Sequence, residues 1–162
     1  MGNTSREEIV EIAKRYLGYP SCAYRRSDVE NHGCNESGFT CSGFVRFVIG
    51  KSGIEIPDRI RHSREFFDHF GVAIHAERVQ SGDLVFFSPN GIFPKHMGIV
   101  VSDDEYISSP GKKDDVVKIR KMKGTYKSDI DQEDPRVLYV ENPIGFKRIA
   151  LPDGTYQEIL KA

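Results

Sequence analysis

The spacing of apolar residues changes near residue 71, and this change limits the possible folds more than any other feature. Before it, apolar residues recur at helical spacing in three segments: 5–17, 42 to 50 or 53, and 60–70. After it, short β-branched or aromatic runs alternate with polar turn residues, at 83–88, 96–102, 106–109, 116–121 and 137–141. Helices followed by strands are typical of an α+β fold with an antiparallel sheet, and we predict that fold class.

The first helical segment carries signals at both of its ends. Ser5 stands three residues before Glu8, an arrangement in which the two side chains satisfy free amides at a helix start. Gly18 and Pro20 follow the last apolar residue and are typical of a helix end. These positions predict an amphipathic helix over 5–17.

Two predictions concern the second half of the chain. Pro-Asp-Gly at 152–154 predicts a turn, and therefore a hairpin, between strands at 146–151 and 155–159. The segment 112–135 carries many charges and is interpreted as a solvated loop or a sheet edge.

Length and composition limit the class of protein. A chain of 162 residues, 38% of them hydrophobic, is long enough for one domain with its own core, and we predict a single domain over 1–162. The net charge of −1, with acids and bases interspersed, argues against a nucleic-acid-binding face. No apolar run is long enough to span a membrane. We also expect the protein to be a monomer. No signal peptide is visible at the N-terminus, so cytoplasmic and exported locations both stay open.

Cys41 has the most informative surroundings of the three cysteines. Residues 37–45, Ser-Gly-Phe-Thr-Cys-Ser-Gly-Phe-Val, place it where an irregular segment becomes an amphipathic helix. Free amides and the positive end of the helix dipole at such a position favour a thiolate, and the amide of Cys41 could hold an oxyanion. Small residues after it leave room for a substrate. The alternative is an ordinary buried cysteine at a helix start.

His96 is the candidate base for this thiol. It opens a run of apolar residues, so its side chain is expected at the end of a sheet rather than in the middle. A nucleophile and its base commonly come from elements distant in sequence. A structural or solvent-facing histidine is the alternative.

Four short segments then resemble the NlpC/P60 cysteine peptidases. Residues 40–45, Thr-Cys-Ser-Gly-Phe-Val, resemble the family's Asp-Cys-Ser-Gly-Phe-Val; residues 82–87 have its Gly-Asp-Leu-Val-Phe-Phe; and 96–99, His-Met-Gly-Ile, resemble its His-Val-Gly-Ile. Arg-His-Ser at 61–63 is similar to its Arg-Thr-Ser. The order and spacing of these segments are specific, and the resemblance extends over 9–110.

The resemblance implies a papain-like α+β fold and amide hydrolysis, most often in peptidoglycan stem peptides, by a γ-D-glutamyl–diamino acid endopeptidase or a related amidase. It implies a peptide or muropeptide substrate. The lack of metal-ligand spacing in the sequence predicts that neither a metal nor another cofactor is needed. The resemblance also implies the site residues: Cys41, His96 and Ser108 as catalytic groups, and Tyr24, Ser42, Arg61 and Asp83 as substrate-binding groups, with Tyr24 near the oxyanion.

The chain departs from the family pattern at three places. The acid before the nucleophile is Thr40, and the glycine pair after Tyr24 is Arg25-Arg26, which makes the substrate wall bulkier and more basic. The third catalytic position, commonly a histidine, is Ser108. A hydroxyl can accept a hydrogen bond from an imidazole but has no charge to stabilise an imidazolium.

Other readings compete with a hydrolase. The same fold could serve as a catalytically silent binding module or as a thiol acyltransferase. A metal-binding or structural domain would use Cys22, His32, Cys34 and Cys41, but these lack the close spacing of a zinc site. His32, His62, His69 and His75 are expected to be structural or at the surface, and His62 is notable only for its place beside Arg61.

Overall fold

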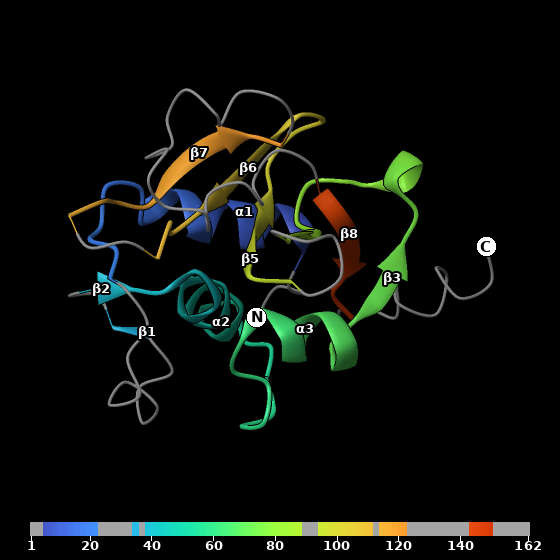
Figure 1. The fold of residues 1–162 in the computed structure, drawn as a ribbon, viewed down its shortest axis with the longest axis horizontal. Helices are drawn as coiled ribbons and strands as arrows, with labels where there is room; N and C mark the ends of the chain where they lie inside the picture. The colour runs from blue at the N-terminus through green and yellow to red at the C-terminus, as the bar shows by residue number, and fades with distance from the viewer. Residues whose placement is uncertain are drawn as a thin grey trace.

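A computed structural model describes residues 5–22, 34–35, 38–88, 94–111, 114–122 and 143–150. Within these residues, three helices accompany a six-stranded antiparallel sheet with the order β3-β8-β4-β5-β6-β7 (Figure 1). The helices are α1 Arg6–Arg15, α2 Cys41–Lys51 and α3 Ser63–His69, with a short 3-10 helix at Ala76–Arg78. The strands of the sheet are β3 Val72–Ile74, β4 Leu84–Phe87, β5 His96–Val100, β6 Glu105–Ser108, β7 Lys118–Lys121 and β8 Pro143–Arg148. Strands β1 Cys34–Asn35 and β2 Gly38–Phe39 form a separate pair. The α+β prediction is confirmed.

Helix α1 begins as its sequence predicts and ends earlier. The Ser5 hydroxyl accepts a hydrogen bond from the Glu8 amide at 3.1 Å and so caps the helix. The helix ends at Arg15, and Gly18 follows with φ +86°, a conformation that favours glycine. Leu17, expected on the buried face, therefore lies beyond the helix and is 41% exposed.

Helix α2 begins at Cys41 because Thr40 caps it. The Thr40 hydroxyl accepts a hydrogen bond from the Gly43 amide at 2.9 Å, and its backbone is extended. The apolar side chains of this helix that were predicted from spacing are fully buried: Phe44, Val45, Val48 and Ile49. The helix packs against β5, which fixes its first turn next to the start of that strand.

The two faces of the sheet belong to separate apolar clusters. On one face, Leu84, Phe86, Met97, Ile99 and Ile107 pack with residues of the helices. On the other face, the cluster consists of Val85, Phe87, Val100, Tyr106 and Met122. Successive side chains of a strand point to opposite faces, so residues of neighbouring strands contact each other only when they lie on the same face.

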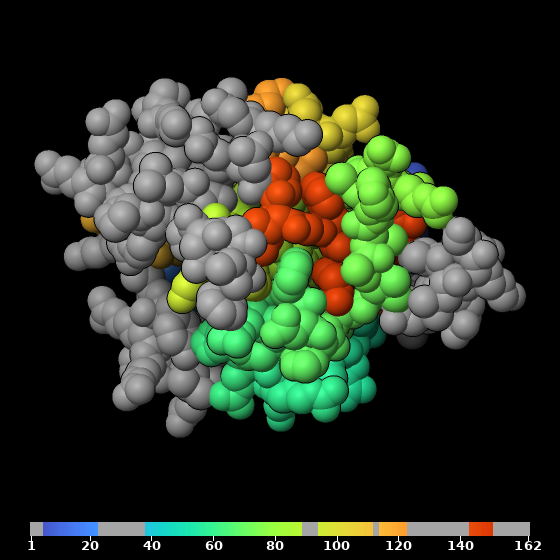
Figure 2. Space-filling model, turned by 45° about the vertical axis from the view of Figure 1, so that its right-hand side comes forward, coloured from blue at the N-terminus to red at the C-terminus, as the bar shows by residue number. Residues whose placement is uncertain are grey.

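Helix α3 covers β8. Gly145 lies under the Phe67 ring, where an added Cβ would come within 2.8 Å of a ring carbon. The Lys147 ammonium donates a hydrogen bond to the Phe67 carbonyl at 2.9 Å. Figure 2 shows this helix beside β8 on the molecular surface. These contacts hold α3 against the sheet.

Several boundaries differ from those predicted. Helix α3 starts at Ser63 rather than at 60, and β3 was not predicted. Strand β7 starts at Lys118 rather than at 116, since Val116 forms only an isolated bridge with Pro20. Within the described part of the sheet, β7 is an edge strand, as predicted for this charged segment. The predicted strand 137–141 and the hairpin turn with its second strand, 152–159, lie outside the described residues. No described helix is long and apolar enough to cross a membrane.

Candidate active site

Cys41 lines a cavity of about 460 Å³ between the start of α2, the start of α3 and the segment that leads into β5. The residues around this cavity, called the Cys41 pocket below, are Thr40, Cys41, Ser42, His62, Ser63, Arg64, Glu65, Pro94 and Lys95. Three segments that are distant in sequence therefore meet at the predicted nucleophile.

The sulfur of Cys41 lies against the backbone on both sides of His96. Its thiol donates a long hydrogen bond to the Lys95 carbonyl, with the sulfur 3.9 Å from the oxygen, and the Met97 amide donates to the sulfur. The amides of Ser42 and of Cys41 itself also donate to it. All three amides lower the pKa of the thiol, but burial acts more strongly and raises the pKa above its ordinary value. The expectation that the helix start would favour a resting thiolate is therefore wrong.

His96 begins β5, as predicted, and is almost fully buried. Its ring lies 5.7 Å from the Phe87 ring and 6.0 Å from the Tyr106 ring, centre to centre. Burial lowers the pKa of His96 to about 3, and the nearby positive charge of Arg120 contributes. At neutral pH the imidazole is therefore uncharged.

Ser108 does not make the hydrogen bond predicted for it. It ends β6, the hairpin partner of β5, and its Cβ lies 3.0 Å from where a Cβ of Gly98 would stand. The residue is fully buried, but within the described part of the chain its hydroxyl has no hydrogen-bond partner. The strand pairing predicted for it is present, and the bond to His96 is not.

The predicted substrate-binding residues are distributed unevenly. Ser42 lines the Cys41 pocket. Arg61 does not: its side chain donates to the Asp58 carbonyl at 2.8 Å. Tyr24 lies outside the described residues, so its predicted role stays a prediction.

Asp83 is fully buried and serves the core. Its two carboxylate oxygens accept hydrogen bonds from the Arg148 guanidinium at 2.8 and 3.0 Å, and one of them also accepts from the Gln80 amide. A carboxylate enclosed in this way has no surface for a substrate. The geometry of Asp83 therefore contradicts the substrate-binding role, and we correct that prediction.

The wall of the pocket formed by α3 was largely missed from the sequence. The Ser63 hydroxyl donates to the Pro94 carbonyl at 3.1 Å, which joins α3 to the segment before His96. Glu65 accepts hydrogen bonds from the Arg61 and His62 amides at 3.2 and 3.1 Å, so its carboxylate caps the helix. His62 was expected to be structural or at the surface; it is the N-cap residue of α3 and also lines the pocket. Its place in the Arg-His-Ser motif was the one signal that could have identified it.

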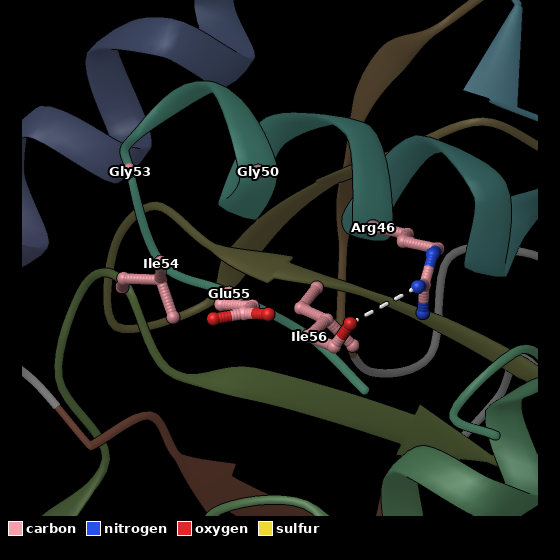
Figure 3. A pocket seen from close by; sticks show the side chains of 6 residues that line it. All are labelled: Arg46, Gly50, Gly53, Ile54, Glu55 and Ile56. Carbon is pink, nitrogen blue, oxygen red and sulfur yellow. Dashed lines mark hydrogen bonds between the residues drawn. The ribbon is translucent and has the colours of Figure 1, made fainter. Parts of the chain in front are cut away.

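A second cavity, of about 330 Å³, lies at the other end of α2. Gly50 and Gly53 open it, because an added Cβ at either position would meet no atom within 4 Å. Figure 3 shows Arg46 reaching from α2 to the Ile56 carbonyl, 3.1 Å away. The same guanidinium also donates to the Pro57 and Ile60 carbonyls. Arg46 thus fixes the loop that leads to α3 and the Cys41 pocket.

No group of three or more His, Cys, Asp or Glu side chains in the described residues could hold a metal ion. The pocket offers a thiol with backbone amides directed at its sulfur. The uncharged imidazole of His96 does not line the pocket; it follows Lys95, which does, and its ring lies against Phe87 and Tyr106.

Residues 30–133 of the chain match the sequence model of the NlpC/P60 family. The chain is 28% identical over 131 residues to a gamma-DL-glutamyl hydrolase of Bacillus subtilis, covering 76% of this chain and 29% of that protein. It is 31% identical over 107 residues to a gamma-D-glutamyl-L-lysine dipeptidyl-peptidase of Bacillus cereus, covering 64% and 28%. The chain therefore spans less than a third of the length of either relative.

A solved structure supports the same relationship. An NlpC/P60 family protein from Bacillus cereus superposes with a TM-score of 0.66 at 26% identity, over 91% of this chain and 41% of that one. The matched family segment contains Cys41, His96 and Ser108, and includes the motifs that first suggested the resemblance. The chain belongs to the NlpC/P60 family.

Proposed function

We propose that this chain is a cysteine hydrolase that cleaves γ-glutamyl amide bonds in peptides of the peptidoglycan stem type, with Cys41 as nucleophile and His96 as base. One observation carries the proposal: the Cys41 sulfur is hydrogen-bonded to the two residues that flank His96. Membership of the family and the resemblance to two γ-glutamyl hydrolases support the same chemistry.

The resting state is a neutral thiol and a neutral imidazole, so proton transfer accompanies attack. The Cys41 sulfur bonds to the amide carbon while its proton passes to the His96 ring. Collapse of the tetrahedral intermediate breaks the carbon–nitrogen bond, and the imidazolium gives its proton to the departing amine. Water, deprotonated by His96, then cleaves the thioester and restores the thiol. The backbone amides of Cys41 and Ser42 are the candidate oxyanion donors.

The charge of the Cys41 pocket supports a γ-glutamyl substrate. A γ-glutamyl bond leaves a free α-carboxylate a few bonds from the scissile amide. Arg64 and Lys95 bring two positive charges to the pocket, and the carboxylate of Glu65 is engaged by backbone amides. Arg64 also pairs with Asp68 at 3.9 Å, so Lys95 is the stronger candidate to meet a substrate carboxylate. The pocket thus offers positive charge to an acidic group beside the reacting bond. The proposed catalytic groups are Cys41 and His96, without Ser108. The single domain over 1–162 and the monomer stay predictions.

The test is product identification. The purified chain is incubated with stem peptides that contain a γ-D-glutamyl–diamino acid bond, and products are identified by mass spectrometry. The proposal predicts cleavage at that bond by the wild type and none by Cys41→Ala. Binding without cleavage would favour the silent module. Transfer of the acyl group to an added amine, without release of the free acid, would favour the acyltransferase.

A further inference from the structure

The carbonyl of Phe39, two residues before Cys41, accepts an unusual set of hydrogen bonds. The Ser109 hydroxyl donates to it at 2.7 Å and the Cys22 amide at 2.9 Å. The Ser21 hydroxyl adds a longer contact of 3.4 Å. Ser109 is fully buried, so its hydrogen bond to the Phe39 carbonyl lies away from bulk water. If the hydroxyl were removed, no water would replace it as a donor to this carbonyl.

The residues next to this carbonyl are fixed on their other sides. The Phe39 ring is fully buried and packs edge-to-face on Phe44, with ring centres 5.5 Å apart. Thr40 caps α2 through its own hydroxyl. The position of the Phe39 carbonyl is therefore coupled through one short, ordered segment to the first turn of α2 and to the Cys41 sulfur.

Ser109 comes directly after β6, which pairs with β5, the strand that His96 begins. The chain leaving β6 stays close to the nucleophile. A Cβ at Gly111 would stand 3.8 Å from the Cys41 nitrogen, and the Gly111 amide donates to the Ser21 hydroxyl at 2.8 Å. The bond from Ser109 to Phe39 thus runs from the sheet that holds His96 to the segment that holds Cys41.

We infer that Ser109 is a positioning residue for the hydrolysis proposed above: its hydroxyl holds the start of α2 against the start of β5 and keeps the Cys41 sulfur beside His96. Ser109 does not touch the sulfur and acts through the Phe39 carbonyl. The inference rests on the proposed function for its effect on turnover. Its effect on the thiol depends only on the contact of the Cys41 sulfur with the start of β5.

That contact gives a readout that does not need a substrate. The Met97 amide lowers the pKa of the Cys41 thiol. If α2 moves away from β5, this hydrogen bond lengthens, but the sulfur also loses the burial that raises its pKa more strongly, so the pKa falls and the thiolate fraction rises. Since the thiolate is the species that reacts with iodoacetamide, the alkylation rate of Cys41 should rise as well.

The experiment compares Ser109→Ala with Ser52→Ala. Ser52 is also buried, and its hydroxyl donates to the Ile49 carbonyl at 2.6 Å at the opposite end of α2. Both variants lose a buried serine hydroxyl bonded to a backbone carbonyl on or beside the same helix. Three quantities are measured for both variants. They are the turnover of the stem peptide, the rate at which iodoacetamide alkylates Cys41 at pH 8 (followed by peptide mass spectrometry), and the free energy of unfolding in urea.

Ser109→Ala should lower kcat about tenfold with little change in KM, the loss expected for one neutral hydrogen bond, and should speed alkylation of Cys41, because the less buried thiol has a lower pKa. Ser52→Ala should keep both rates while losing similar stability. Ser109→Thr, which retains the hydroxyl, should restore much of the lost kcat. Unchanged or slower alkylation in Ser109→Ala, or equal changes of both rates in Ser52→Ala, would overturn the inference. So would failure of Ser109→Ala to fold, which would make the hydroxyl a folding requirement. A wild type that cleaves none of the peptides would end the proposed function, and the alkylation rates would still decide the role of Ser109.

Discussion

The sulfur of Cys41 lies 3.9 Å from the carbonyl oxygen of Lys95, the residue directly before His96. The amide on the other side of His96, from Met97, donates to the same sulfur. A cysteine at a helix start is thus placed at the first residues of a strand more than fifty positions away in sequence. The packing of α2 on β5 produces this placement, and the predictions below test its consequences.

Replacement of Asp83 by Asn should destabilise the fold and leave turnover per folded molecule unchanged. The variant loses the charge that compensates the Arg148 guanidinium, whose side chain is only 10% exposed. Breaking a buried ion pair in this way costs about 3–5 kcal/mol. The free energy of unfolding is measured in urea, and kcat and KM are measured on the folded fraction.

Asp104→Asn is the matched control. Asp104 pairs with Lys121 at 2.8 Å, but both side chains are largely exposed and solvent screens the pair, so the loss should be much smaller than for Asp83→Asn. A large rise in KM for Asp83→Asn at unchanged stability would restore the substrate-binding role that the geometry contradicts.

Acid should destabilise this protein through His96. Its pKa is lowered from 6.5 to about 3 in the folded state, so between these values the unfolded chain binds more protons. The free energy of unfolding should therefore fall as pH is lowered through this window, by up to about 1.4 kcal/mol per pH unit from this residue. Urea unfolding between pH 7 and 4 measures it, and His96→Gln should show a shallower dependence.

Arg120→Gln should raise the pKa of His96, because the positive charge of Arg120 is the second cause of the lowered value. The shift is only partial, since burial, the larger cause, remains. NMR titration of the His96 ring reports it directly. Lys121→Gln removes the same charge from the next residue of β7, whose ammonium binds Asp104 at the surface, and should leave the His96 titration unchanged. Equal shifts in both variants would show that overall charge, and not the place of Arg120, is responsible.

Lys95→Glu should raise KM for a stem peptide with a free α-carboxylate on its γ-glutamyl residue. The change keeps the backbone carbonyl beside Cys41 and reverses one of the two pocket charges that are proposed to attract the carboxylate. About 1 kcal/mol, or roughly a fivefold rise, is expected for an exposed charge. The same peptide with that carboxylate amidated should show little change. Lys14→Glu makes the same charge reversal on α1, whose residues do not line the pocket, and should leave KM unaltered for both peptides. A rise of equal size for the amidated peptide would contradict this role.

The sequence predicted the parts of the site that follow from local periodicity. Cys41 opens a helix and His96 opens a strand because the apolar residues after each have helical and strand spacing, respectively. The hairpin of β5 and β6 followed from two short apolar runs around a polar turn. These features depend on neighbours in sequence, so a single chain reveals them.

Features that depend on long-range partners were not predictable in this way. Asp83 was assigned to substrate binding from the family resemblance, and nothing near it in sequence indicates Arg148, which lies 65 residues away and bonds both of its carboxylate oxygens. The place of Ser108 on β6 was correct, but strand register alone does not direct a hydroxyl toward an imidazole. The prediction of a thiolate at Cys41 from the helix dipole failed because burial of the thiol raises its pKa more than the amides lower it.

The nucleophile itself is tested most directly by trapping its acyl-enzyme. Wild type, Cys41→Ala and Cys22→Ser are mixed with a γ-glutamyl stem peptide, quenched in acid and digested, and the peptide that carries position 41 is examined by mass spectrometry. The account predicts a γ-glutamyl adduct on Cys41 in the wild type and in Cys22→Ser, and neither adduct nor cleavage in a folded Cys41→Ala. Cleavage that persists in Cys41→Ala would contradict it.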